Sequence, residues 1–221
     1  MQDIASESGR RSRRKGVVVP VALIVALVAG FGVWKFWLSD DPLVAVPDRV
    51  CSRSLPGDSL RPLLPERGEA FEEHAFDFSP RGSLSAPGKC VLSGGGKSVH
   101  IGYYMVFWPD GYRKEDVDRD AKKPGNLPVT FGEAKGHVEG YVKGYVEGGA
   151  VRLFVDCPRV NGHDGLLQVT ASLGGESGKL KDRPSMARVA GLAADSARAL
   201  GQRVEGCDSA TRLPDGAPGI G

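Results

Sequence analysis

The sequence lacks a basic surplus outside its first residues. The chain carries 29 Lys and Arg against 27 Asp and Glu, a net charge of +2. The basic cluster at residues 10–15 accounts for more than this whole excess, so the segment 39–221 is slightly acidic. A protein that binds nucleic acid uses basic side chains to neutralise phosphates. We therefore expect no nucleic-acid partner.

A complete phosphate-binding loop is also lacking. The segment "GGGKS" (94–98) ends like the Walker motif G-x-x-x-x-G-K-S/T, but the first glycine of that motif would fall at Val91. The apolar alternation that follows predicts a strand, whereas the motif requires a helix at this point. We interpret the segment as a turn that begins a strand, and we expect no nucleotide and no cofactor.

Motifs for catalysis and metal binding are lacking as well. The sequence has no G-x-S-x-G nucleophile elbow, and its four histidines show no paired ligand spacing. Asp116, Asp118 and Asp120 have the spacing of a calcium loop, but Ala121 stands where that loop needs glycine, so we predict a solvated acidic loop. We expect no metal site, no catalytic residue and no enzyme activity. A pair of lone carboxylates leaves no sequence pattern, so a hydrolase stays an alternative.

Residues 17–38 form the longest apolar run and predict a transmembrane helix, since about 22 residues at about 1.5 Å each span a bilayer core. No small-x-small cleavage site follows, which favours an uncleaved signal-anchor over a removable signal peptide. Basic residues before the run favour a cytoplasmic N-terminus and a single-pass protein whose C-terminal domain is extracytoplasmic. The predicted partner of residues 17–38 is the lipid bilayer, with interface residues Arg13, Arg14, Lys15, Trp34, Lys35 and Trp37.

The four cysteines all follow this segment, and no pair has C-x-x-C spacing. An even number of cysteines in an oxidising compartment indicates two disulfides, for which three pairings exist. We favour Cys51–Cys90 and Cys157–Cys207, which each close a loop of about 40 to 50 residues.

The domain organisation follows from composition. We expect a cytoplasmic basic segment at 1–16, the membrane helix at 17–38, a linker at 39–46, one extracytoplasmic domain at 47–208 and a flexible tail at 209–221. Within the domain we predict a short helix at 56–66, strands at 97–108, 136–149, 150–157 and 166–173, and a long helix at 184–204. The predicted fold class is α+β: an antiparallel β-sheet with the C-terminal helix packed on one face, preceded by a single N-terminal transmembrane helix.

The pattern "CSRSLPGDSLRPLLPE…GKCVLSGGGKSVHIGYY…LFVDCP…MARVAGLAADSARALGQRVEGC" resembles uncharacterised cell-envelope proteins of actinomycetes, some of which are lipid-anchored and some helix-anchored. This sequence departs from them in having "CVL" where Cys-x-Trp is frequent, and in lacking a lipobox. The resemblance implies an envelope location, structural disulfides and an α+β ectodomain. It implies no activity.

These observations predict a non-catalytic binding or interaction domain at the cell envelope, with a cell-wall polymer or a membrane protein as partner. The alternatives are a cell-envelope hydrolase with an unrecognised site, or a sensor or accessory subunit of a membrane complex. The candidate ligand surface is a group of aromatic residues that could stack on sugar rings: Tyr104, Trp108, Tyr141 and Tyr145.

Overall fold

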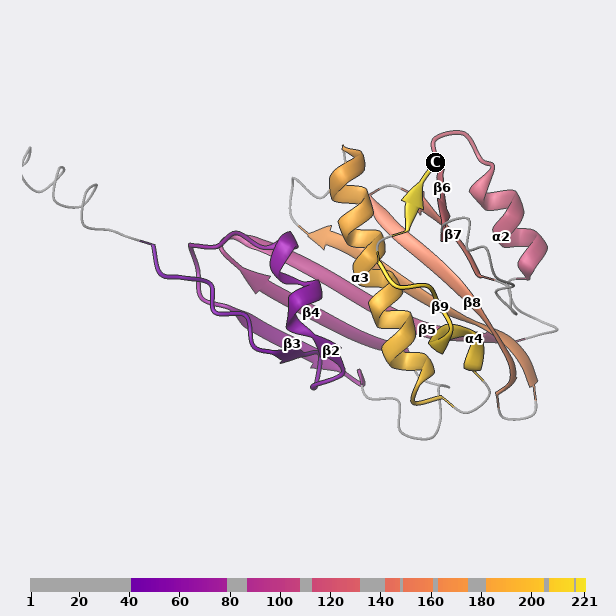
Figure 1. Cartoon of the computed structure of the whole chain (residues 1–221), viewed down its shortest axis with the longest axis horizontal. Coiled ribbons are helices and arrows are strands. Elements are labelled where there is room, and N and C mark those ends of the chain that lie inside the picture. Colours follow the sequence, from indigo (N-terminus) through magenta and orange to yellow (C-terminus); the bar gives the residue numbers. More distant parts are fainter. Residues whose placement is uncertain are drawn as a thin grey trace, which may run out of the picture. The chain divides into compact units, whose positions relative to one another are not determined.

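The computed structural model describes residues 41–78, 87–107, 113–131, 142–147, 149–160, 163–174, 182–204, 207–216 and 218–221. From Pro42 onward the chain forms one compact unit. Its main element is an eight-stranded antiparallel sheet of order β10-β6-β7-β8-β9-β5-β4-β3 (Figure 1). The strands are β3 (Glu72–Phe76), β4 (Gly88–Gly94), β5 (Lys97–Phe107), β6 (Leu127–Thr130), β7 (Val142–Glu147), β8 (Ala150–Val160), β9 (His163–Gly174) and β10 (Gly219–Ile220).

The sheet consists of two runs of neighbouring strands. The hairpins β3–β4–β5 form one run, and β6–β7–β8–β9 form the other. Between them lies the helix α2 (Lys114–Ala121), which carries the chain from β5 to β6. The second run then returns across the sheet until β9 pairs with β5, in register from Ser98↔Gly174 to Phe107↔Gly165. The longest strands therefore lie at the centre of the sheet.

The glycine-rich segment is a turn, as the sequence predicts. Gly95 and Gly96 join β4 to β5 with φ of 59° and 75°. A two-residue hairpin turn of type I′ requires positive φ at both positions, which glycine adopts without a steric penalty. The segment therefore closes a hairpin and does not precede a helix, so the phosphate-loop interpretation is excluded by the backbone.

The long C-terminal helix is confirmed as α3 (Arg183–Gly201). Asp182 caps it by accepting a hydrogen bond from the backbone N–H of Ser185 at 2.8 Å, and Pro184 lies in the first turn. Its apolar face, which includes Val189 and Leu200, is buried against the sheet. Figure 1 shows α3 lying across one face of the sheet, over β8 and β9.

Two local predictions are wrong. The segment 56–66 forms two separate 3-10 turns, η1 (Gly57–Ser59) and η2 (Arg61–Leu63), because Pro62 has no N–H to continue an α-helix. The predicted acidic loop is the helix α2. Its start is stabilised because Asp116 accepts a hydrogen bond from the backbone N–H of Arg113 at 2.9 Å.

Both ends of the domain extend further than the composition suggests. In the expected linker, the backbone N–H of Val44 bonds the carbonyl of Glu66 at 2.9 Å. The expected flexible tail contains α4 (Asp208–Thr211) and β10, and Leu213 is buried within it. Short segments rich in glycine and proline can pack against a core once another part of the chain supplies their hydrogen-bond partners.

The predicted fold class is corrected in one respect. Its antiparallel sheet and C-terminal helix are present, together with a small second sheet of β1 (Arg49–Val50) and β2 (Leu55–Pro56). In the part of the chain that the structure describes, however, no helix is long and apolar enough to cross a membrane. Residues 17–38 and the six predicted interface residues lie outside that part.

Candidate functional site

The two faces of the sheet differ because side chains alternate along each strand. On β5, the side chains of Val99, Ile101 and Tyr103 point toward α3 and are buried. The intervening residues point to the opposite side, where His100 is half-buried and Tyr104 is exposed. The alternation that the sequence predicts for this strand is therefore confirmed over these residues.

The side of the sheet opposite α3 is itself divided into two parts. Over one part, Val117 of α2 packs on Tyr145, Phe154 and Leu166 and forms a small second core. No described helix packs on the other part, over β3, β4 and β5. We call this second part the open face, and define it by six side chains that point away from α3: His74, Phe76, Lys89, His100, Tyr104 and Thr170.

Cross-strand pairing places these side chains in rows. Phe76 pairs with Lys89, Lys89 with Gly102, and Gly102 with Thr170. Because paired residues of antiparallel strands share a face, this row crosses the open face from the edge strand β3 to β9. Gly102 has no side chain and lies in the middle of the row. The row therefore has no side chain at the position between Lys89 and Thr170.

Tyr104 is the central aromatic residue of the open face. It is 41% exposed. Its hydroxyl donates to Oε1 of Gln168 at 2.5 Å, and Nε2 of Gln168 in turn donates to Oγ1 of Thr170 at 3.3 Å. Gln168 is buried, so these two bonds satisfy an amide that would otherwise be costly to desolvate. The tyrosine ring is held in a defined orientation on the surface.

Phe76 is the second aromatic residue and is 63% exposed. Phe76 is on β3, two strands away from β5, and it is aligned with Gly102, two residues before Tyr104. These two displacements correspond to about 12 Å between Phe76 and Tyr104. The residues between them are polar or small. The open face therefore presents two separated aromatic rings among polar side chains, together with the half-buried Val91 between His74 and His100.

The polar groups of the open face form no catalytic arrangement in the described residues. Ser98 Oγ lies 3.4 Å from Nε2 of His100, but no carboxylate orients that imidazole. His74 lies 3.8 Å from a carboxylate oxygen of Glu72, and both side chains are largely exposed. The described residues contain no group of three side chains that could hold a metal ion. These groups can donate and accept hydrogen bonds to a ligand.

The structure separates Tyr104 and Tyr145, the two described members of the predicted aromatic ligand surface. Tyr104 lies on the open face, whereas Tyr145 is buried and its ring stacks on Phe154 with a centroid distance of 6.0 Å. Tyr145 therefore has a packing role, and its assignment to a ligand surface is wrong. Trp108 and Tyr141 lie outside the described residues. The sequence prediction missed Phe76, although its alternation with polar residues in "EEHAF" (72–76) places it on the outer face of a strand.

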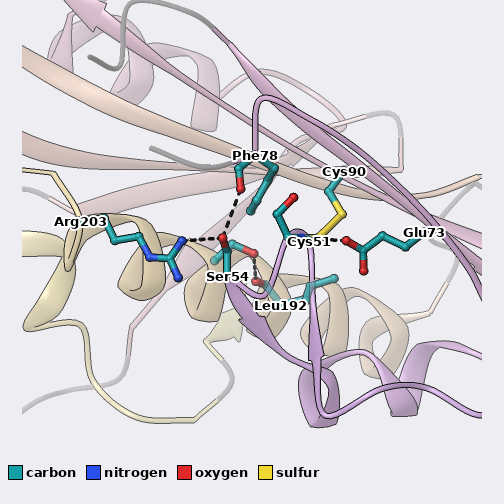
Figure 2. Close-up of a disulfide and its surroundings, with 9 residues drawn as sticks. Cys51, Ser54, Glu73, Phe78, Cys90, Leu192 and Arg203 are labelled. Atoms are coloured by element: carbon teal, nitrogen blue, oxygen red, sulfur yellow. Dashed lines mark hydrogen bonds between the residues drawn. A yellow bond between two sulfur atoms is a disulfide. The ribbon is translucent and has the colours of Figure 1, made fainter. Parts of the chain in front are cut away.

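A left-handed turn packs against β3 and β4 on the α3 side of the sheet, opposite the open face. Cys51, Ser52 and Arg53 have φ of 55°, 56° and 62°, a conformation that side chains other than glycine rarely adopt. The disulfide from Cys51 to Cys90 of β4 holds the turn, and the backbone N–H of Ser52 donates to a carboxylate oxygen of Glu73 at 2.7 Å (Figure 2). Covalent and polar contacts thus fix a strained segment against β3 and β4.

The next residue connects this turn to the rest of the core. Ser54 is buried; its hydroxyl donates to the carbonyl of Phe78 at 3.2 Å and accepts from the guanidinium of Arg203 at 2.7 Å (Figure 2). The hydroxyl of Tyr103 donates to the neighbouring carbonyl of Asp77 at 2.9 Å. Burial, and secondarily the charge of Asp77, raise the pKa of Tyr103, which keeps the phenol neutral as a donor. These contacts support the sheet beneath the open face.

The second disulfide joins Cys157 of β8 to Cys207, which directly precedes α4, and both cysteines are buried. The pairing favoured from the sequence is therefore confirmed for all four cysteines. One disulfide fixes the N-terminal turn to the sheet, and the other fixes the segment after α3.

No family model, curated protein or solved structure matches the chain. The resemblance to actinomycete envelope proteins stays a prediction. The function is therefore argued from the open face and its surroundings.

Proposed function

We propose that this protein is a non-catalytic binding domain that acts outside the cytoplasm and uses the open face as its ligand surface. The observation that carries the proposal is the exposure of Phe76 and Tyr104 on the same, largely polar face of the sheet. Both rings point from the same face of the sheet, so one extended ligand can contact the two of them.

The ligand that suits this surface is a polysaccharide chain. A sugar ring has an apolar face that packs on an aromatic ring, and hydroxyl groups at its edge that need hydrogen-bond partners. Tyr104 and Phe76 supply the rings, and Lys89, His100 and Thr170 supply polar groups around them. Separated rings on one sheet face can contact successive units of an extended polymer, whereas a small molecule is usually enclosed in a cavity. A cell-wall polymer is the proposed ligand.

The proposed location outside the cytoplasm is supported by the two disulfides. Disulfides persist in oxidising compartments and are rare in a reducing cytosol. All cysteines of the chain are paired, and all four are buried.

The experiment is a sedimentation assay of the purified protein with insoluble cell-wall polysaccharide. We expect the wild-type protein to sediment with the polymer, and Phe76→Ala and Tyr104→Ala each to weaken the binding about tenfold. Leu43→Ala is the matched control, because Leu43 is 67% exposed but lies outside the sheet. Binding by the control should match that of the wild type.

A further variant blocks the surface without removing a side chain. An added Cβ at Gly102 would meet only one neighbour, the carbonyl oxygen of Gly88 at the ordinary distance of 3.7 Å. Gly102→Arg should therefore fold and should place a bulky charged side chain on the open face, between Lys89 and Thr170 and beside Tyr104. Unchanged sedimentation of this variant, or of both alanine variants, would refute the assignment of the open face. Turnover of wall fragments by the wild-type protein would refute the non-catalytic role.

A further inference from the structure

A groove of about 410 Å³ runs along α3. Its floor is the helix surface between Arg188 and Arg198, and its walls are the η1–η2 segment around Pro62 and the C-terminal segment around Asp215. Figure 1 shows these two segments, in purple and yellow, beside α3. The groove is separate from the open face, which points away from this helix.

The middle of the groove is polar but carries no unpaired charge. Asp195 accepts hydrogen bonds from the hydroxyl of Ser59 and from the guanidinium of Arg198. The same guanidinium donates to the carbonyl of Pro214 at 2.6 Å. The side chains of Asp195 and Arg198 are only 29% and 17% exposed. This network joins both walls to the floor and gives the groove a fixed shape.

The two ends of the groove carry opposite charges, Arg188 and Asp215. Each of these side chains can form a further hydrogen bond to a ligand. At one end, Arg188 donates from Nε and Nη1 to the carbonyls of Pro184 and Pro62, both at 3.3 Å. Its Nη2 has no partner among the described residues. Toward the other end, Asp215 follows the carbonyl that binds Arg198, and its carboxylate has no hydrogen bond or ion pair within the described part of the chain.

The length of the groove follows from the helix. Arg188 and Arg198 are separated by about three turns, which corresponds to about 15 Å along the axis. An extended peptide rises about 3.3 Å per residue, so about four residues fit between the ends. Nη2 of Arg188 can donate a charge-assisted hydrogen bond to a carboxylate, and a carboxylate such as that of Asp215 binds an ammonium group.

We propose that this groove binds a short peptide of about four residues with free termini. The terminal carboxylate lies on Arg188, the terminal ammonium group lies on Asp215, and the backbone lies over Gly191, whose missing side chain leaves room on the floor. The site is independent of polysaccharide binding by the open face.

The test is isothermal titration of the full chain with tetra-alanine. We expect saturable binding, at least a tenfold loss for tetra-alanine with an acetylated N-terminus and an amidated C-terminus, and at least a tenfold loss in each of Arg188→Gln and Asp215→Asn. Arg183→Gln and Asp164→Asn are matched controls, because both residues are exposed charges outside the groove. The controls should bind tetra-alanine like the wild type.

Three results would overturn the proposal: absence of binding at millimolar tetra-alanine, equal binding of the capped peptide, or equal losses in the groove variants and their controls. Circular dichroism of each variant checks that the fold is retained. Loss of sedimentation with wall polysaccharide in the open-face variants has no bearing on this result, because those residues lie on the other side of the sheet.

Discussion

The two disulfides should contribute unequally to stability although they close loops of similar length. The sequence separations are 39 for Cys51–Cys90 and 50 for Cys157–Cys207, and loop-closure entropy assigns each about 4 kcal/mol. Both pairs are fully buried, so replacement of either pair by alanine removes similar side-chain contacts.

The difference arises from the left-handed turn that begins at Cys51. Three successive residues have positive φ, and each costs about 1 kcal/mol or more relative to a right-handed conformation. When the Cys51–Cys90 bond is removed, the turn can relax and recover about 3 kcal/mol of this strain. The net loss for C51A/C90A is therefore about 1 kcal/mol, against about 4 kcal/mol for C157A/C207A.

The assay is urea unfolding of both double variants beside the wild type, with the free energy of unfolding taken at constant m. In thermal unfolding, the same difference corresponds to a Tm decrease of roughly 2–4 °C for C51A/C90A and roughly 8–16 °C for C157A/C207A. Ser52→Gly with Arg53→Gly in the intact protein provides an independent measure, and it should increase stability because glycine adopts positive φ freely. Equal losses in the two double variants, together with no gain from the glycines, would refute the strain explanation.

Three further predictions concern single residues. Gly88→Ala should lower the free energy of unfolding by roughly 1–3 kcal/mol in urea, because the added Cβ would lie 2.2 Å from the ring of Tyr103. Tyr104→Phe should cost about 1 kcal/mol in the same assay, because Gln168 loses a donor, yet it should bind polysaccharide better than Tyr104→Ala does. Hydrogen bonds from the backbone and side chain of Ser185 lower the pKa of Asp182. The contribution of Asp182 to stability is therefore present above about pH 4 and is lost as the pH falls through the lowered pKa. Unfolding curves from pH 7 to pH 2 should show less acid dependence for Asp182→Asn than for the wild type.

The parts of the fold that could be predicted are those specified by local patterns. Strand β5 alternates with period two, and α3 combines a capping aspartate, a proline in its first turn and an apolar stripe. Helix α2 was missed because only Val117 of it is buried, so it has no apolar stripe, and its capping residue is an arginine whose role depends on Asp116. Glu115 and Asp116 in the first turn are an ordinary helix-start signal, but the segment has neither a Ser, Thr, Asp or Asn cap nor an apolar stripe beside it.

The candidate site could be predicted only in part, because exposure depends on distant elements. The neighbours of Tyr104 in "GYYMV" (102–106) are more apolar than those of Tyr145 in "KGYVE" (143–147), yet Tyr104 is the exposed residue. Tyr145 is buried because β7 pairs with β8 and brings its ring onto Phe154, and because α2 covers both. Tyr104 stays exposed because no described helix reaches its part of the sheet. Neither fact follows from the residues near each tyrosine.

The pair Gly95–Gly96 has an effect far from the turn itself. An antiparallel strand that slips by one position exchanges its inner and outer residues, so Ile101 would turn outward and Tyr104 inward. The tight hairpin allows only one alignment of β4 with β5, from Gly94↔Lys97 to Gly88↔Tyr103. Two glycines that contact no ligand thus decide which alternate side chains of β5 point to the open face. A loop lengthened by one residue would no longer fix this register.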